Sequence, residues 1–132
     1  MKSILLPTDF SKISLNAINY ATNIYKDEPC QFYLLNVYRI PYLANEELME
    51  HNVSQLSAME DEMHEASIED MKKVLAQIPE NKNHVYEIIS DYNLFNLAVH
   101  QAVEEKDIEL IIMGTKGATG AREIFLGSNT SD

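Results

Sequence analysis

Short apolar runs alternate with longer segments of helical periodicity along most of the chain. The apolar runs, which predict strands, are residues 3–9, 31–38, 85–89 and 108–113. The periodic segments, which predict helices, are about 12–26, about 55–78 and a third that begins near Asp91 or Asn93. Such alternation is typical of a parallel sheet with helices on both faces, because each parallel connection needs a crossover. The pattern therefore predicts a single three-layer α/β/α domain over residues 1–132.

The sequence also indicates which strands are buried, where the first helix begins and where a long connection lies. The runs 31–38 and 108–113 are almost continuously apolar, which is typical of strands buried on both faces, whereas 85–89 alternates imperfectly and is predicted at a sheet edge. Ser11 is in the position to cap the first helix. Between 39 and 54 the periodicity is lost, so a long connection is expected there.

All four glycines of the chain come after the last apolar run, at Gly114, Gly117, Gly120 and Gly127. In open α/β sheets, ligands bind in the crevice outside the carboxyl ends of the strands. Glycine has no Cβ to separate a phosphate from the backbone amides, so this segment predicts an anion site. The alternative is a turn without a ligand.

Two other phosphate loops are excluded by the spacing. A P-loop needs Gly-Lys-Ser/Thr, but here Lys116 precedes Gly117 and that tripeptide occurs nowhere in the chain. A dinucleotide fingerprint follows the first strand, whereas these glycines follow the last apolar run.

Net charge and cysteine content indicate which classes of partner are disfavoured and in which cellular compartment the protein is expected. The net charge of -11 would repel nucleic acid and anionic membranes, so neither is an expected partner. Cys30 is the only cysteine, and the chain has no signal peptide or apolar run of membrane-spanning length, so a cytoplasmic protein is expected.

The sequence offers little for metal binding or catalysis. His64 and Glu65 lack a second histidine four residues on, so the zinc-helix pattern fails. The methionines of the 55–78 segment are expected to fill the core. No metal site and no catalytic residue is predicted.

The glycine segment resembles the universal stress protein family in its ATP-binding subclass. The motif of that subclass is G-x2-G-x9-G-[ST], and Gly114, Gly117, Gly127 and Ser128 occupy its four defined positions. The resemblance extends to the segments 4–11, 35–37 and 111–115, and so to essentially the whole chain. It implies a strand order of 3-2-1-4-5, in which Asp9 and the Gly114 loop border one crevice.

The resemblance also implies where a nucleotide binds. Adenine is expected against Val37 and near Asp9, whose carboxylate can accept a hydrogen bond from a ribose hydroxyl, while the glycines approach ribose and phosphates. Lys116 either adds positive charge or is solvated, and Asp9 is either a ligand or a cap of its loop. The complete set of implied binding residues is Pro7, Thr8, Asp9, Val37, Met113, Gly114, Thr115, Lys116, Gly117, Gly127, Ser128, Asn129 and Thr130.

The chain departs from the family at its end. Only four residues follow Ser128, whereas the family continues with a helix and a fifth strand that closes the sheet and usually mediates dimers. A truncated chain is therefore expected, for example the first half of a tandem two-domain protein, with its fifth strand missing and the 108–113 strand left as an exposed edge. A homodimer or pairing with a second domain of the family is the expected assembly.

The resemblance implies two function classes, of which the first is preferred because no base, nucleophile or metal-ligand cluster accompanies the phosphate loop. The first is an adenine-nucleotide-binding regulatory module of the stress response that holds ATP with little or no hydrolysis. The second is an enzyme on the same crevice, a slow ATPase or an adenylating enzyme, that uses ATP with Mg²⁺. A scaffold with an empty crevice is a third and lesser alternative.

Overall fold

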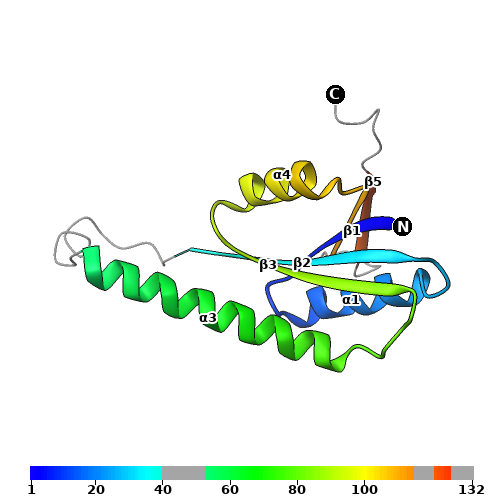
Figure 1. Ribbon diagram of the computed structural model, residues 1–132, viewed down its shortest axis with the longest axis horizontal. Coiled ribbons are helices and arrows are strands. Elements are labelled where there is room, and N and C mark those ends of the chain that lie inside the picture. Colours follow the sequence, from blue (N-terminus) through cyan, green and yellow to red (C-terminus); the bar gives the residue numbers. More distant parts are fainter. Residues whose placement is uncertain (40–52, 115–120, 126–132) are drawn as a thin grey trace.

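The computed structural model describes residues 1–39, 53–114 and 121–125. The elements of this part are β1 (Lys2–Pro7), α1 (Lys12–Ile24), β2 (Cys30–Tyr38), α3 (Val53–Gln77), β3 (His84–Tyr92), α4 (Phe95–Lys106), β4 (Leu110–Gly114) and β5 (Ala121–Phe125). The strands form one sheet in the order β3-β2-β1-β4-β5, and the first four of these are parallel (Figure 1). The predicted α/β class and the parallel order 3-2-1-4 are confirmed.

The sheet has a separate apolar core on each face. Successive side chains of a strand point to opposite faces, so Ile4 and Leu6 enter one core while Leu5 enters the other. The first core includes Met71 of α3, and the second includes Ala98 of α4. Figure 1 accordingly shows α1 and α3 below the sheet and α4 above it. This is the three-layer arrangement that the periodicity predicts.

The start of α4 differs from the prediction. Asp91 or Asn93 was expected to cap this helix, but the N-cap residue is Leu94, which forms no side-chain cap hydrogen bond. The reason is that β3 is longer than the predicted 85–89 strand and continues to Tyr92, which keeps Asp91 within the sheet. The side chain of Asn93 instead accepts a hydrogen bond from the Leu94 amide at 2.8 Å.

The expectation that the fourth strand would be an exposed edge is wrong. Residues 121–125 form β5, which pairs antiparallel with β4 from Leu110↔Phe125 to Gly114↔Ala121. An antiparallel neighbour needs only a short connection and no crossover helix, so a strand can follow β4 closely in the sequence. Within the described part of the chain the sheet edges are therefore β3, as predicted, and β5.

No helix in the described ranges has both the length and the apolar character needed to cross a membrane.

Candidate functional site

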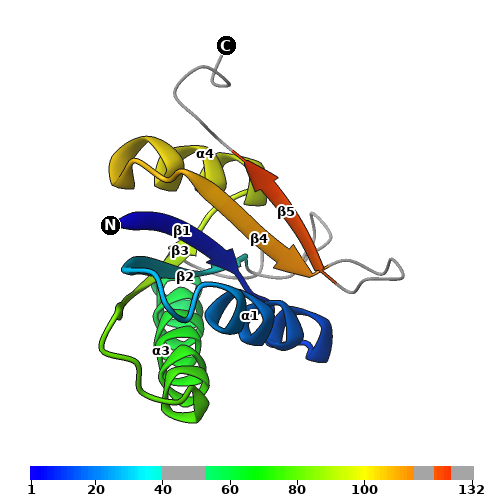
Figure 2. The same cartoon turned by 90° about the vertical axis from the view of Figure 1, so that its right-hand side faces the viewer.

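A cleft of about 360 Å³ lies at the carboxyl ends of β1, β2 and β4. Its lining residues are Pro7, Thr8, Asp9, Ser11, Ile13, Ser14, Val37, Phe95, Met113 and Gly114. Figure 2 shows β1 and β4 pointing toward the same end of the sheet, beside α1. β2 and β4 lie on opposite sides of β1, so the strand order reverses between β1 and β4 and the cleft opens at the point where a ligand site is expected.

The structure brings together six of the residues implied by the resemblance. These six are Pro7, Thr8, Asp9, Val37, Met113 and Gly114. The other seven lie outside the described residues: Thr115, Lys116, Gly117, Gly127, Ser128, Asn129 and Thr130. The described part of the cleft is thus the part expected to meet the nucleoside.

The turn from β1 into α1 forms the floor of the cleft and is held in an uncommon backbone conformation. Phe10 has a φ of 66°, in the left-handed region that costs a residue with a Cβ about 1–2 kcal/mol. Two hydrogen bonds hold it there. The Phe10 amide donates to the Thr8 hydroxyl at 3.0 Å, and the Ser11 amide donates to Oδ1 of Asp9 at 2.9 Å.

A directed chain of hydroxyls continues from this turn into α1. The Ser14 hydroxyl donates to the Ser11 carbonyl at 3.0 Å, so its single proton is used there. The Thr8 hydroxyl, 2.8 Å from that of Ser14, must therefore be the donor of that pair. The Ser11 hydroxyl accepts from the Ser14 amide at 3.2 Å, which confirms Ser11 as the predicted N-cap. The rigid chain leaves these side chains little freedom to rotate.

Asp9 is exposed at the cleft and is the charged residue among its described lining residues. Hydrogen bonds from the Ser11 side chain and then from the Ser11 backbone lower the pKa of its carboxyl. It is therefore ionised at neutral pH. A carboxylate has about four acceptor sites, so the hydrogen bonds from Ser11 leave capacity for a ligand hydroxyl.

The bond from Ser11 bears on the two roles that the sequence allows for Asp9, a ligand or a cap of its loop. From the sequence, an acid at the end of a central strand has no evident structural reason. The structure supplies such a reason, since Asp9 caps the turn. The ligand role and the capping role use different acceptor sites and are compatible.

A buried polar network supports the cleft from behind. Asn36 of β2 donates to the Thr8 carbonyl at 2.9 Å, and its Oδ1 accepts from Ser67 of α3 at 2.7 Å. Ser67 in turn accepts from Ser90 of β3 at 2.8 Å. The network joins four elements and fixes the end of β1 relative to β2, because unpaired buried polar groups would be costly. The sequence signal was Asn36, an amide between the apolar residues Leu35 and Val37.

Gly114 is required by close packing of the protein against itself. A Cβ on this residue would lie 2.5 Å from Cγ2 of Ile13, 2.6 Å from its carbonyl oxygen and 2.8 Å from its carbonyl carbon. The end of β4 therefore contacts the first turn of α1 directly. This contact explains the glycine without a ligand, and it also sets the width of the cleft between β4 and α1.

Four lining residues were not among the predicted binding residues. Ser11 and Ser14 belong to the capping turn, and Ile13 follows from the contact with Gly114. Phe95 comes from the start of α4 on the other face of the sheet and is 43% exposed. Of these four, only the residues of the β1–α1 turn could have been predicted from the sequence, because this turn directly follows a predicted central strand.

The lining suits an uncharged planar group that carries hydroxyls. Ile13, Val37, Phe95 and Met113 provide apolar walls, while Asp9 provides an anionic acceptor. The described lining residues include no lysine or arginine, so phosphate binding would depend on residues outside them. The described residues also contain no group of three or more histidine, cysteine or acidic side chains placed to hold a metal.

Comparison with known proteins agrees with this architecture. The model of the universal stress protein family matches residues 1–132. Universal stress protein MJ0531 of Methanocaldococcus jannaschii is 30% identical over 138 aligned positions, covering 96% of this chain and 72% of the relative.

Solved structures show the same fold. The protein MJ0577, whose biochemical function was assigned from its structure, superposes with a TM-score of 0.69 at 19% identity, over 89% of this chain and 77% of that protein. A universal stress protein in complex with cAMP superposes with a TM-score of 0.52 at 14% identity, over 90% of this chain and 82% of the other. From the full-length family match and the relative MJ0531, we conclude that this chain belongs to the universal stress protein family.

Proposed function

We propose that the cleft binds an adenine nucleotide and that the protein is an ATP-binding regulatory module of the stress response. The observation that carries the proposal is the pairing of apolar walls with the ionised carboxylate of Asp9 at the ends of β1 and β4. A base can lie between the walls while a ribose hydroxyl donates to Asp9. A family member that superposes on this chain was solved with cAMP, which supports an adenine nucleotide as the ligand class.

The two halves of the nucleotide would meet different parts of the chain. Val37 and Asp9 would contact the nucleoside, whereas Gly117, Ser128 and Lys116 would face the phosphates of ATP, alone or as its Mg²⁺ complex. Binding with little or no hydrolysis is proposed because, among the described lining residues, the one carboxylate is Asp9, which is already hydrogen-bonded to its turn. Turnover of labelled ATP, with and without Mg²⁺, separates this function from a slow ATPase or an adenylating enzyme.

Asp9→Asn is the sharpest test of the nucleoside half. Asparagine keeps an oxygen for the Ser11 amide but offers an NH₂ donor where the ribose hydroxyl would donate, so the turn survives while the ligand contact is lost. We expect calorimetry to show adenosine and ATP binding about tenfold weaker or more, as for the loss of a hydrogen bond to a charged group. Affinity for inorganic triphosphate should change little.

The matched control is Asp27→Asn, which removes an exposed carboxylate between α1 and β2. It should leave every affinity unchanged. Equal affinities of the Asp9→Asn and wild-type proteins for adenosine would refute the assignment of Asp9, and an absence of ATP binding by the wild type would refute the function itself.

A further inference from the structure

The outer edge of β3 is a long and regular strand edge. All nine residues of β3 pair with β2 in one unbroken parallel register, from Cys30↔His84 to Tyr38↔Tyr92. Among the described residues, no strand pairs with its other side. Edge strands are commonly protected by proline, a bulge or charged side chains. The sequence HVYEIISDY of β3 contains no proline, and its two charged residues, Glu87 and Asp91, are both acidic and so oppose an acidic strand but not a basic one. Its backbone groups therefore present a template for a further strand.

A groove of about 380 Å³ accompanies this edge between α3 and α4. Figure 1 shows β3 lying between these two helices, with α3 below it and α4 above it. Ile88 and Ile89 point to opposite faces of the sheet and both line the groove, as do Ile68 of α3 and Ala102 of α4. An added strand would find apolar contacts for its side chains on both faces. The groove shares no described lining residue with the nucleotide cleft.

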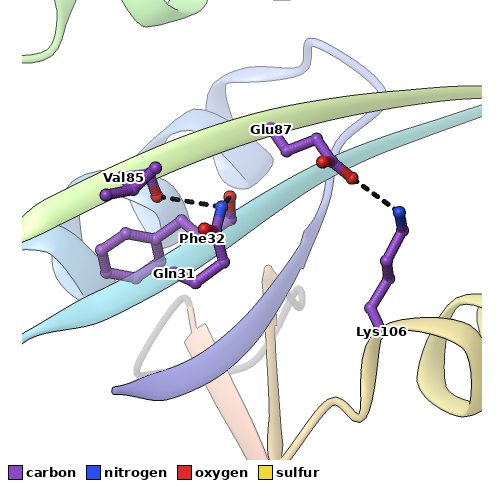
Figure 3. Close-up of polar contacts among 5 residues, drawn as sticks. All are labelled: Gln31, Phe32, Val85, Glu87 and Lys106. Atoms are coloured by element: carbon purple, nitrogen blue, oxygen red, sulfur yellow. Dashed lines mark hydrogen bonds and ion pairs between the residues drawn. The ribbon is translucent and has the colours of Figure 1, made fainter.

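The charge of the groove is negative. Glu87, Asp91 and Glu105 line it, and the lining cation Lys106 is already engaged, with its Nζ 2.9 Å from Glu87 (Figure 3). The field along the edge therefore favours positive charge.

From this combination we propose that the β3 edge binds an extended, lysine- or arginine-rich segment of another polypeptide, which adds to the sheet as a strand. Backbone hydrogen bonds provide the pairing, and the carboxylates of Asp91 and Glu105 select the cationic side chains. A second copy of this chain is disfavoured, because pairing β3 with β3 would bring Glu87 and Asp91 close to like charges.

The probe is a fluorescently labelled peptide as long as β3 that alternates lysine with valine. We expect it to bind the full chain in an anisotropy titration, and we expect bound peptide to slow hydrogen exchange at β3 amides between His84 and Tyr92. Two matched peptides test the contributions of side-chain charge and of backbone hydrogen bonds. Glutamate in place of lysine should abolish binding through charge, and N-methylation of alternate amides should abolish it by removing backbone donors.

The protein variants test the location. Asp91→Asn with Glu105→Gln removes two charges from the groove, whereas Glu69→Gln with Glu104→Gln removes two exposed carboxylates of α3 and α4 outside it. The first pair should weaken peptide binding roughly threefold to tenfold, as expected for partly exposed ion pairs, and the second should not.

Four outcomes overturn the proposal. These are no binding of the lysine peptide, equal binding of its N-methylated form, equal weakening by the two variant pairs, and protection of β3 by self-association at high protein concentration. The last outcome would identify a second copy of the chain as the occupant.

Discussion

The hydroxyl of Thr8 lies 2.8 Å from the hydroxyl of Ser14 and accepts a hydrogen bond from the Phe10 amide at 3.0 Å. One buried side chain thus links the end of β1, the left-handed residue of the turn and the first turn of α1. The shape of the cleft floor depends on this link, because the turn carries Asp9 into the cleft.

Thr8→Val should destabilise the domain by about 1–3 kcal/mol, because it leaves the Phe10 amide without its acceptor and removes the donor to Ser14. Urea denaturation measures the effect. Thr22→Val is the control, since that hydroxyl donates to the Asn19 carbonyl on an exposed helix surface, and its loss should cost less than about 0.5 kcal/mol. Equal costs for the two variants would contradict the role of Thr8.

Gly114→Ala should destabilise the domain by about 1–3 kcal/mol through steric overlap with α1. The added methyl group would meet both Cγ2 and the carbonyl oxygen of Ile13. Shortening Ile13 to alanine removes only the first of these contacts, so the double variant should recover little of the lost stability. Full recovery in thermal unfolding would show that side-chain crowding alone requires the glycine.

Asn36→Ala should cost about 2–4 kcal/mol, because Thr8 loses a donor to its carbonyl and Ser67 loses its acceptor within a buried network. Ser67→Ala should cost less, since the Thr8 bond remains. In a double-mutant cycle the two changes should be less than additive, because they remove the same Ser67–Asn36 bond. Strict additivity would mean that the network does not act as a unit.

Stability should also depend on the ionisation of Asp9. The folded state lowers the pKa of this carboxyl below its ordinary value, so the ionised group stabilises the fold. That contribution is complete above the unfolded pKa of about 3.9 and is lost as pH falls through the lower folded value. The stability difference between wild type and Asp9→Asn should therefore stay constant at neutral pH and shrink below about pH 4. Urea midpoints over that range measure it, and a constant difference down to about pH 3 would contradict the assignment.

The lining residues that lie at strand ends could be predicted from the sequence. Pro7, Thr8 and Asp9 end the 3–9 run, and Val37 and Met113 lie at or near the ends of two others. Parallel strands place these ends at one edge of the sheet, and the strand order implied by the family resemblance makes β2 and β4 the neighbours of β1.

Other features depended on contacts between distant segments and had no local signal. Phe95 reaches the cleft from α4, and Ser67 meets Asn36 only because α3 crosses β2 at that point. β5 was missed for a different reason. Residues 121–125 were interpreted as the spacer of a glycine motif, whereas backbone pairing with β4 decides their structure.

Removing β5 should make the chain associate through the outer edge of β4. β4 is strongly apolar, with Ile111 and Ile112 buried, and its outer side is paired through Ile111↔Ile124 and Ile112↔Glu123. A chain that ends at Gly114 would expose this side as an unpaired edge, and such edges are templates for intermolecular pairing. We expect light scattering to show concentration-dependent association of the shortened chain, together with a lower unfolding temperature, despite the acidic composition. The full chain under the same conditions is the reference, and removing only residues 126–132 is the matched control, because it leaves β5 in place. A monodisperse product ending at Gly114 would show that β5 does not protect the edge of the sheet.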